Sequence, residues 1–345
     1  PGQKAYLEGR QWLAQRTAEG LNNAIYYFET AIDLDPGFAP AYADLASTFA
    51  LALFYRYDVA YDGYTMAAKA MNLAETAIAL DRNLAAGYAA RGLLGVQIGQ
   101  PAREIAADFD RAEQLSPNSA ANPSWRSLAL AQLGRIEEAF AEAERAVALD
   151  PLGAGRQIAL ASVAFELGRF DEAISAARIA SALEPGLVAG RAIEARSQIL
   201  NGSPEQCVNL LVSAYRVLRA TCMAAADRMG DAQMIVDRVL LEIEDGDDAA
   251  PGYTEVITFE ELAVYYATIG DAAKSQEYLV RAVAASPAGM EFRLFDSGLY
   301  DRVRGDHNFK AATGAIRSEL YDRVRRLSAR LDPQPIQHPM PLDDR

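Results

Sequence analysis

Residues 120–151 read AANPSWRSLALAQLGRIEEAFAEAERAVALDP, and residues 154–185 read AGRQIALASVAFELGRFDEAISAARIASALEP. Both stretches carry Leu-Gly-Arg near the middle and end in Leu-x-Pro. A spacing of 34 residues separates successive members of two series, Gly134, Gly168 and Gly202, and Pro117, Pro151 and Pro185. A fixed period of this length is typical of one supersecondary unit stacked on copies of itself.

Within each copy the residues predict a helical hairpin. The glycine supplies the left-handed residue that ends a first helix, and Glu137 and Glu138 begin the second, where the helix dipole favours anions. Pro151 ends that second helix because proline cannot donate a backbone hydrogen bond. Small residues spaced by four and three share one face of the second helix and permit close packing. They are Ala139, Ala143 and Ala146, and again Ala173, Ala177 and Ala180.

This combination resembles the tetratricopeptide repeat, which implies an all-α, right-handed α-solenoid of about eight helical hairpins. Weaker copies run outward, including a hairpin over Met223–Leu241 that we expect to be broken at Gly230–Asp231. We expect one continuous solenoid over residues 1–330 and an extended, Pro-rich tail over 331–345. Within the solenoid we expect an aromatic insertion at about 52–66, an acidic loop at about 244–254 and a C-terminal capping helix at about 309–331.

Two end segments carry a narrower resemblance. Tyr6–Arg10, Ala31–Pro36 and Phe38–Ala46 at the start, and Leu262–Tyr266 and Leu299–Asp306 at the end, are similar to the solenoid of certain bacterial signalling proteins. In that family the solenoid follows a winged-helix regulator, a protein kinase or a class III adenylate cyclase domain. The resemblance implies a sensory or regulatory role with the chemistry in an upstream domain. The chain departs from the family at Asp301-Arg302, where Asp-Pro is usual, and over the acidic residues 243–256.

Composition limits the kinds of partner. The formal net charge of −14 argues against nucleic acid, whose phosphates require a basic footprint. The longest apolar candidate, Leu45–Tyr55, is too short to span a bilayer. Because the chain begins at Pro1 and shows no signal peptide, we interpret it as a processed or truncated product that resides in the cytoplasm, with export left open.

The sequence contains few of the residues and motifs that enzymes use for catalysis. The chain has two histidines, His307 and His338, and it has no Gly-rich phosphate loop or metal-ligand motif, so we expect no enzyme activity, no cofactor and no metal. Cys207 and Cys222 are interpreted as buried reduced thiols, with a disulfide as the alternative. The rival enzyme hypothesis is a helical toroid that uses Glu260-Glu261, but adjacent residues face different directions on a helix.

The candidate partner-binding surface is the concave face, which the first helices of the hairpins should line. Positions 2, 5, 9, 12 and 13 of the repeat should point toward it, and a peptide or protein would bind there. The alternative is that several of these side chains are interhelical core. The selected residues are Ser124, Leu128 and Gln132, then Ile158, Ser162, Phe165 and Glu166, and finally Arg196.

Two further segments are candidates for contact. The insertion offers Tyr55, Arg56, Tyr57 and Tyr61, which either bind a partner or pack the loop against the solenoid. From Arg302 to Arg330 there are eight Arg or Lys against three Asp or Glu, which suits a polar solenoid cap or self-association with another copy. The function expected is therefore a protein-interaction module, and a structural scaffold in a larger complex is the alternative.

Overall fold

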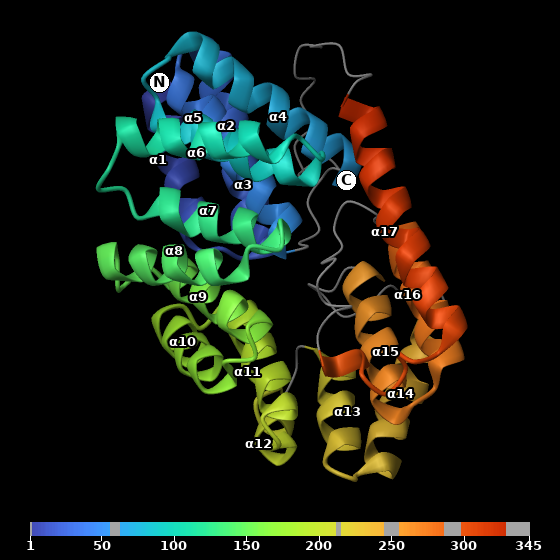
Figure 1. Ribbon diagram of the computed structural model, residues 1–345. Coiled ribbons are helices and arrows are strands. Elements are labelled where there is room, and N and C mark those ends of the chain that lie inside the picture. The colour runs from blue at the N-terminus through green and yellow to red at the C-terminus, as the bar shows by residue number, and fades with distance from the viewer. Residues whose placement is uncertain (1, 56–62, 212–214, 245–254, 286–297, 329–345) are drawn as a thin grey trace. The chain divides into compact units, whose positions relative to one another are not determined.

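The regular structure is helical throughout the described residues. The computed structural model describes residues 2–55, 63–211, 215–244, 255–285 and 298–328, and over these ranges it contains seventeen α-helices and no strand (Figure 1). The all-α fold class predicted from the repeat period is confirmed.

The chain divides into two compact units. The first contains six helices: α1 (Gly2–Ala14), α2 (Ala18–Leu34), α3 (Ala39–Tyr55), α4 (Gly63–Leu80), α5 (Ala85–Gln97) and α6 (Ala102–Leu115). Its core is built on α3, where almost every residue from Ala41 to Leu53 is buried. A helix that is apolar on all sides occupies the centre of such a unit.

The second unit begins at α7 and continues into α17. Its helices are α7 (Ala121–Gln132), α8 (Ile136–Leu149), α9 (Ala154–Glu166), α10 (Phe170–Leu183), α11 (Val188–Leu200), α12 (Pro204–Val208), α13 (Arg216–Ala225), α14 (Met229–Glu244), α15 (Glu255–Ile269), α16 (Ala272–Ala285) and α17 (His307–Ser328), with the 3-10 helix η3 (Gly298–Tyr300) between the last two.

Consecutive helices pack as hairpins, and the hairpins stack. Helices α7 and α8, α9 and α10, α11 and α12, α13 and α14, and α15 and α16 form five such pairs in the second unit. The second helix of one pair packs on the first helix of the next, as α8 does on α9 and α10 does on α11. The stacked hairpin is the architecture that the 34-residue period predicted, and α1 with α2 and α5 with α6 form the same kind of pair in the first unit.

The small residues predicted at the helix crossings are buried. Ala139, Ala143 and Ala146 on α8 have no exposed surface, and the same holds for Ala173, Ala177 and Ala180 on α10. Side chains of this size allow the helix backbones to approach closely. The register read from the sequence is therefore correct for these two second helices.

Each hairpin turn of the second unit closes through the same backbone pattern. At Gly168, φ is +74°, its N–H donates to Phe165 O at 3.0 Å, and the N–H of Arg169 donates to Ala164 O at 2.9 Å. This is the Schellman arrangement, which uses a left-handed residue to satisfy the last carbonyls of a helix. In three of these turns an arginine follows and bonds to a carboxylate in the first turn of the second helix, as in Arg169–Glu172.

One turn lies away from its predicted position. The hairpin of α13 and α14 turns at Asp227, where φ is +58°, and the N–H of Arg228 donates to Met223 O at 2.8 Å. Gly230 lies inside α14 and is helical, so the predicted break at Gly230–Asp231 is wrong by three residues. Arg228 bonds to Asp231 three residues later, as Arg169 bonds to Glu172 after the turn at Gly168. This repeated spacing of Arg and an acidic residue could have located the turn from the sequence.

Two hairpins depart from the regular length. Helices α3 and α4 have 17 and 18 residues, whereas α5 has 13 and α8 has 14, so part of the predicted insertion lengthens these two helices. In the opposite sense, α12 has 5 residues where α10 has 14. The period is therefore lost after Gly202 because the second helix of that hairpin is short.

Candidate functional site

The predicted binding face is formed by α7, α9 and α11. These three first helices pack side by side, α7 on α9 and α9 on α11, within the second unit. Equivalent repeat positions therefore recur along the row: Gln132 and Glu166 are 34 residues apart, and so are Ser162 and Arg196.

Three of the predicted contact residues are buried. Ser124 is 2% exposed, Leu128 is 6% exposed and Ile158 is 1% exposed. Ser124 and Ile158 occupy the same position in successive repeats, and Ala192, one repeat further on, is also buried. This repeat position therefore belongs to the packing between helices, and these side chains cannot touch a ligand without a rearrangement.

The other five predicted residues are half-buried and lie toward the carboxyl ends of their helices. They are Gln132 on α7, Ser162, Phe165 and Glu166 on α9, and Arg196 on α11. Of these, Phe165 packs against two hydrophobic clusters of the unit, so most of its apolar surface is committed to packing. The polar side chains at positions 162, 166 and 196 are those best suited to contact a partner.

The chain itself occupies the end of this face. Gly298 of η3 lies against Leu200 of α11, because a Cβ built on Gly298 would stand 3.1 Å from Leu200 Cδ2. Ile199 and Leu200 both pack against the hydrophobic cluster that contains Leu299 and Tyr300. Among the described residues, η3 therefore bounds this face at Ile199 and Leu200 of α11.

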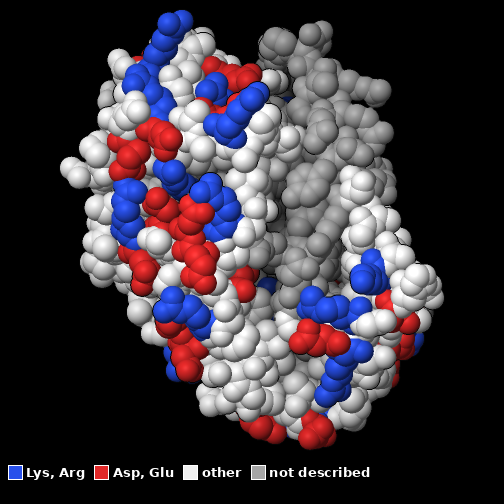
Figure 2. All heavy atoms as spheres, in the orientation of Figure 1, with Lys and Arg blue, Asp and Glu red and all other residues white. Residues whose placement is uncertain are grey.

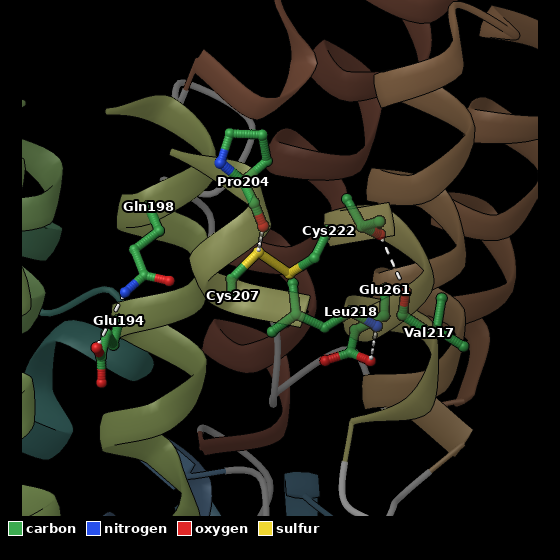
Figure 3. Close-up of a disulfide and its surroundings, with 9 residues drawn as sticks. Glu194, Gln198, Pro204, Cys207, Val217, Leu218, Cys222 and Glu261 are labelled. Carbon is green, nitrogen blue, oxygen red and sulfur yellow. Dashed lines mark hydrogen bonds between the residues drawn. A yellow bond between two sulfur atoms is a disulfide. The ribbon is translucent and has the colours of Figure 1, made fainter. Parts of the chain in front are cut away.

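A buried acidic side chain on α11 forms hydrogen bonds within the protein and has a structural role. Glu194 is 3% exposed, and its Oε1 accepts hydrogen bonds from Arg178 Nε at 2.7 Å and Gln198 Nε2 at 3.0 Å. Because Arg178 belongs to α10, this carboxylate joins one hairpin to the next. Figure 3 shows the hydrogen bond between Glu194 and Gln198. Glu194 fixes the position of the helix that carries Arg196.

The aromatic insertion lies mostly outside the described residues. Arg56, Tyr57 and Tyr61 are not among them, and Tyr55 is described only as the last residue of α3. Contact through these four residues stays a prediction.

The two cysteines form a disulfide. Cys207 of α12 is joined to Cys222 of α13, and neither residue has exposed surface (Figure 3). The expectation of burial is confirmed and that of reduced thiols is wrong. Cys207 takes the small-residue position of Ala173, and Cys222 lies on the first helix of the next hairpin, where stacking brings it within reach. The loss of period after Gly202 hid this proximity in the sequence.

The adjacent pair Glu260 and Glu261 on α15 is also buried, each residue being 1% exposed. Glu261 Oε2 accepts a hydrogen bond from the backbone N–H of Leu218 at 3.2 Å, at the first turn of α13. A carboxylate at a helix N-terminus satisfies an unpaired donor and interacts favourably with the helix dipole. This residue stabilises a helix, which is a structural role.

The C-terminal helix α17 begins two residues before its predicted start. Phe309 and Ile316 pack into the hydrophobic cluster of the second unit, while Lys310 and Ala311 are exposed. One buried stripe with a polar outer face is the arrangement that a solenoid cap requires.

In the described part of the chain, no helix combines the length and hydropathy needed to cross a bilayer. Within the same residues, no three His, Cys, Asp or Glu side chains are grouped so as to hold a metal ion.

Comparison with known proteins gives a likeness in the arrangement of helices. No protein-family model and no curated protein sequence matches the chain. Among solved structures, a tetratricopeptide-repeat protein of Thermus thermophilus is 22% identical, with a TM-score of 0.45 over 58% of this chain and 100% of that chain. Yeast Tom70 is 16% identical, with a TM-score of 0.47 over 90% of this chain and 67% of that chain. YrrB, a tetratricopeptide-repeat protein with an unusual peptide-binding site, is 17% identical, with a TM-score of 0.35 over 61% of this chain and 96% of that chain.

Proposed function

We propose that the chain is a non-catalytic protein-interaction module that binds a peptide or protein on the row of first helices α7, α9 and α11. The observation that carries the proposal is the recurrence of half-buried polar side chains along that row, at Gln132, Ser162, Glu166 and Arg196. Residues of this kind give orientation and specificity to a bound peptide, while the neighbouring apolar groups give affinity.

The charges on the row define what would bind there. Glu166 and Arg196 stand on adjacent helices, so the row presents an anionic and a cationic group to one ligand. A peptide with a basic and an acidic side chain in the matching order fits this face. A carboxylate clamp is disfavoured, because the face lacks the lysines and asparagines that such a clamp uses.

A sensory or regulatory role in a bacterial signalling protein is part of the same proposal. The end segments that resemble bacterial signalling solenoids support a sensory or regulatory module whose output lies in another domain. Nucleic acid is excluded as a partner on charge, and self-association through α17 is proposed as a secondary interaction.

A scaffold subunit is the second candidate, and the Cys207–Cys222 disulfide favours it. Structural disulfides persist in oxidising compartments and are rare in the cytosol. This counts against the expected cytoplasmic location and supports an exported chain. An exported chain would be separated from a cytoplasmic output domain and would act through assembly.

A capture experiment with a matched control tests the binding face. Immobilised parent protein and the Arg196→Glu variant are incubated with lysate of the source cell, and Arg103→Glu on the exposed surface of α6 serves as the control. The proposal expects proteins retained by the parent and the control to be lost from Arg196→Glu, with helical content unchanged in all three. Equal retention by Arg196→Glu would contradict the proposal.

A further inference from the structure

A groove of about 670 Å³ lies on the hairpin of α13 and α14, away from the proposed peptide-binding row. Four arginines line it: Arg216 and Arg219 from α13, Arg228 from the turn, and Arg238 from α14. Met223 and Met234 contribute apolar surface between them. Figure 2 shows basic side chains, with acidic ones beside them, over the region of these two helices.

Two carboxylates partly neutralise the groove. Glu242 accepts hydrogen bonds from Arg216 and Arg238, and Asp231 accepts from Arg228 at 2.7 Å. The hydrogen bond from Arg216 holds the pKa of Glu242 below its usual value, so this carboxylate is charged at neutral pH. Four guanidinium groups against two carboxylates leave two surplus positive charges in a chain of net charge −14.

Arg219 is the cation whose charge is least compensated. Its Nε atom is buried and has no hydrogen-bond partner among the described residues. An unpaired guanidinium N–H that is shielded from water is costly. The Arg219 side chain as a whole is half-buried, so its positive charge can pair with a carboxylate in the groove.

The groove lies between α13 and α14, and among the described residues none from α11 or α12 lines it. The Cys207–Cys222 disulfide joins α12 to the last turn of α13. Residues 209–211 continue the chain from α12 toward α13, and Leu211 is buried in the hydrophobic cluster of the second unit.

We propose that this groove binds an acidic, amphipathic helix of a partner protein, because its lining combines surplus positive charge with exposed apolar side chains. Carboxylates of the helix pair with Arg219 and the other arginines, and its apolar side chains pack against Met223, Met234 and Ile235. Methionine side chains adapt readily to a variable apolar partner.

The interaction is testable with a defined peptide. The probe is a fluorescein-labelled, helix-forming peptide with Glu and Leu repeated at i, i+4 spacing, and its control has Gln in place of every Glu. Fluorescence anisotropy gives the Kd for the parent, Arg219→Glu, Met234→Asp and Arg103→Glu. We expect the Glu-containing peptide to bind the parent, the Kd to rise at least about tenfold in Arg219→Glu, and Arg103→Glu to match the parent. Met234→Asp is expected to weaken binding as well, and added salt should weaken it further.

Several outcomes would overturn the proposal. They are undetectable binding to the parent, equal binding of the Gln peptide, and an unchanged Kd in Arg219→Glu. Should Arg219→Glu lose helical content, Arg238→Glu, at an exposed position of α14, replaces it with the same expectation. Analytical ultracentrifugation of the protein alone tests whether a second copy of this chain occupies the groove. Self-association that Arg219→Glu abolishes would show that it does, and would contradict binding of a partner helix. The Arg196→Glu variant should bind the probe like the parent, so this groove can fail or succeed independently of the α7, α9 and α11 row.

Discussion

Glu261 and Leu218, 43 residues apart in sequence, are joined by a hydrogen bond of 3.2 Å from the backbone N–H of Leu218 to the carboxylate of Glu261. Helix α13 begins after Tyr215, a left-handed residue that makes no side-chain capping hydrogen bond. The carboxylate on α15 therefore does for α13 what a local Ser or Asp does for other helices. It also ties together the two hairpins that follow the loss of the 34-residue period.

Glu261→Ala should lower the free energy of unfolding by about 0.5–2 kcal/mol, the range measured for loss of a helix cap. Urea denaturation followed by circular dichroism gives this value. Hydrogen exchange at the first turn of α13 should accelerate more than exchange in α9. Glu277→Ala, at an exposed position of α16, is the control and should leave both measurements unchanged. A Glu261→Ala variant as stable as the parent would mean that α13 is not capped by α15.

The position of the α13–α14 turn can be tested with two substitutions. Asp227→Gly should stabilise the protein by roughly 0.5–1 kcal/mol, because glycine adopts a φ of +58° without the cost that a side chain incurs. Gly230→Ala should also stabilise it, by about 0.4–1 kcal/mol, since Gly230 is helical and an added Cβ meets nothing within 4 Å. Destabilisation by Gly230→Ala would instead place the turn at Gly230.

The crossing of the hairpins at α10 gives a packing prediction. Ala173 has no exposed surface and lies in the cluster formed with Ala139 and Val163. Ala173→Leu should destabilise the protein by about 1–3 kcal/mol, because the larger side chain overfills a packed interface. Ala284→Leu on the exposed surface of α16 is the matched control. Equal melting temperatures for the two variants would be incompatible with the repeat register.

The disulfide gives a redox-dependent prediction. The two cysteines are 15 residues apart in sequence, and closing a loop of that size stabilises by about 3 kcal/mol in the chain-entropy account. Dithiothreitol should therefore lower the Tm of the parent, and it should have no effect on a Cys207→Ala, Cys222→Ala double variant. Mass spectrometry after alkylation provides the direct check: two labelled cysteines without prior reduction of the unfolded chain would show that the disulfide does not form.

The sequence predicted the regular hairpins because glycine and proline at fixed spacing determine where helices end. It located Gly134, Gly168 and Gly202 correctly, and each has a positive φ. The turn at Asp227 was not predicted, because no glycine occupies the left-handed position there. The sequence also missed the disulfide, since Cys207 fits the small-residue position and the short α12 removed the register that would have related it to Cys222.

The binding row was predicted less well than the fold. Register fixes which residues share a helix face, but the face also packs against the neighbouring first helices. Ser124 and Ile158, at position 5, are buried for this reason. At position 9, Leu128 is buried, whereas Ser162 and Arg196 are half-buried. The arginine groove was not predicted at all, because it depends on side chains that α13, α14 and the turn between them bring together.

The central proposal is that a partner binds on the row of α7, α9 and α11, and site-specific photo-crosslinking in the source cell tests it most directly. A benzoylphenylalanine residue is placed at Ser162 on the row in one variant and at Ala284 on α16 in another. The proposal predicts a covalent adduct of one defined mass from Ser162 only, which disappears when Arg196→Glu is added. Adducts from Ala284 only, or an adduct from Ser162 that persists with Arg196→Glu, would contradict it.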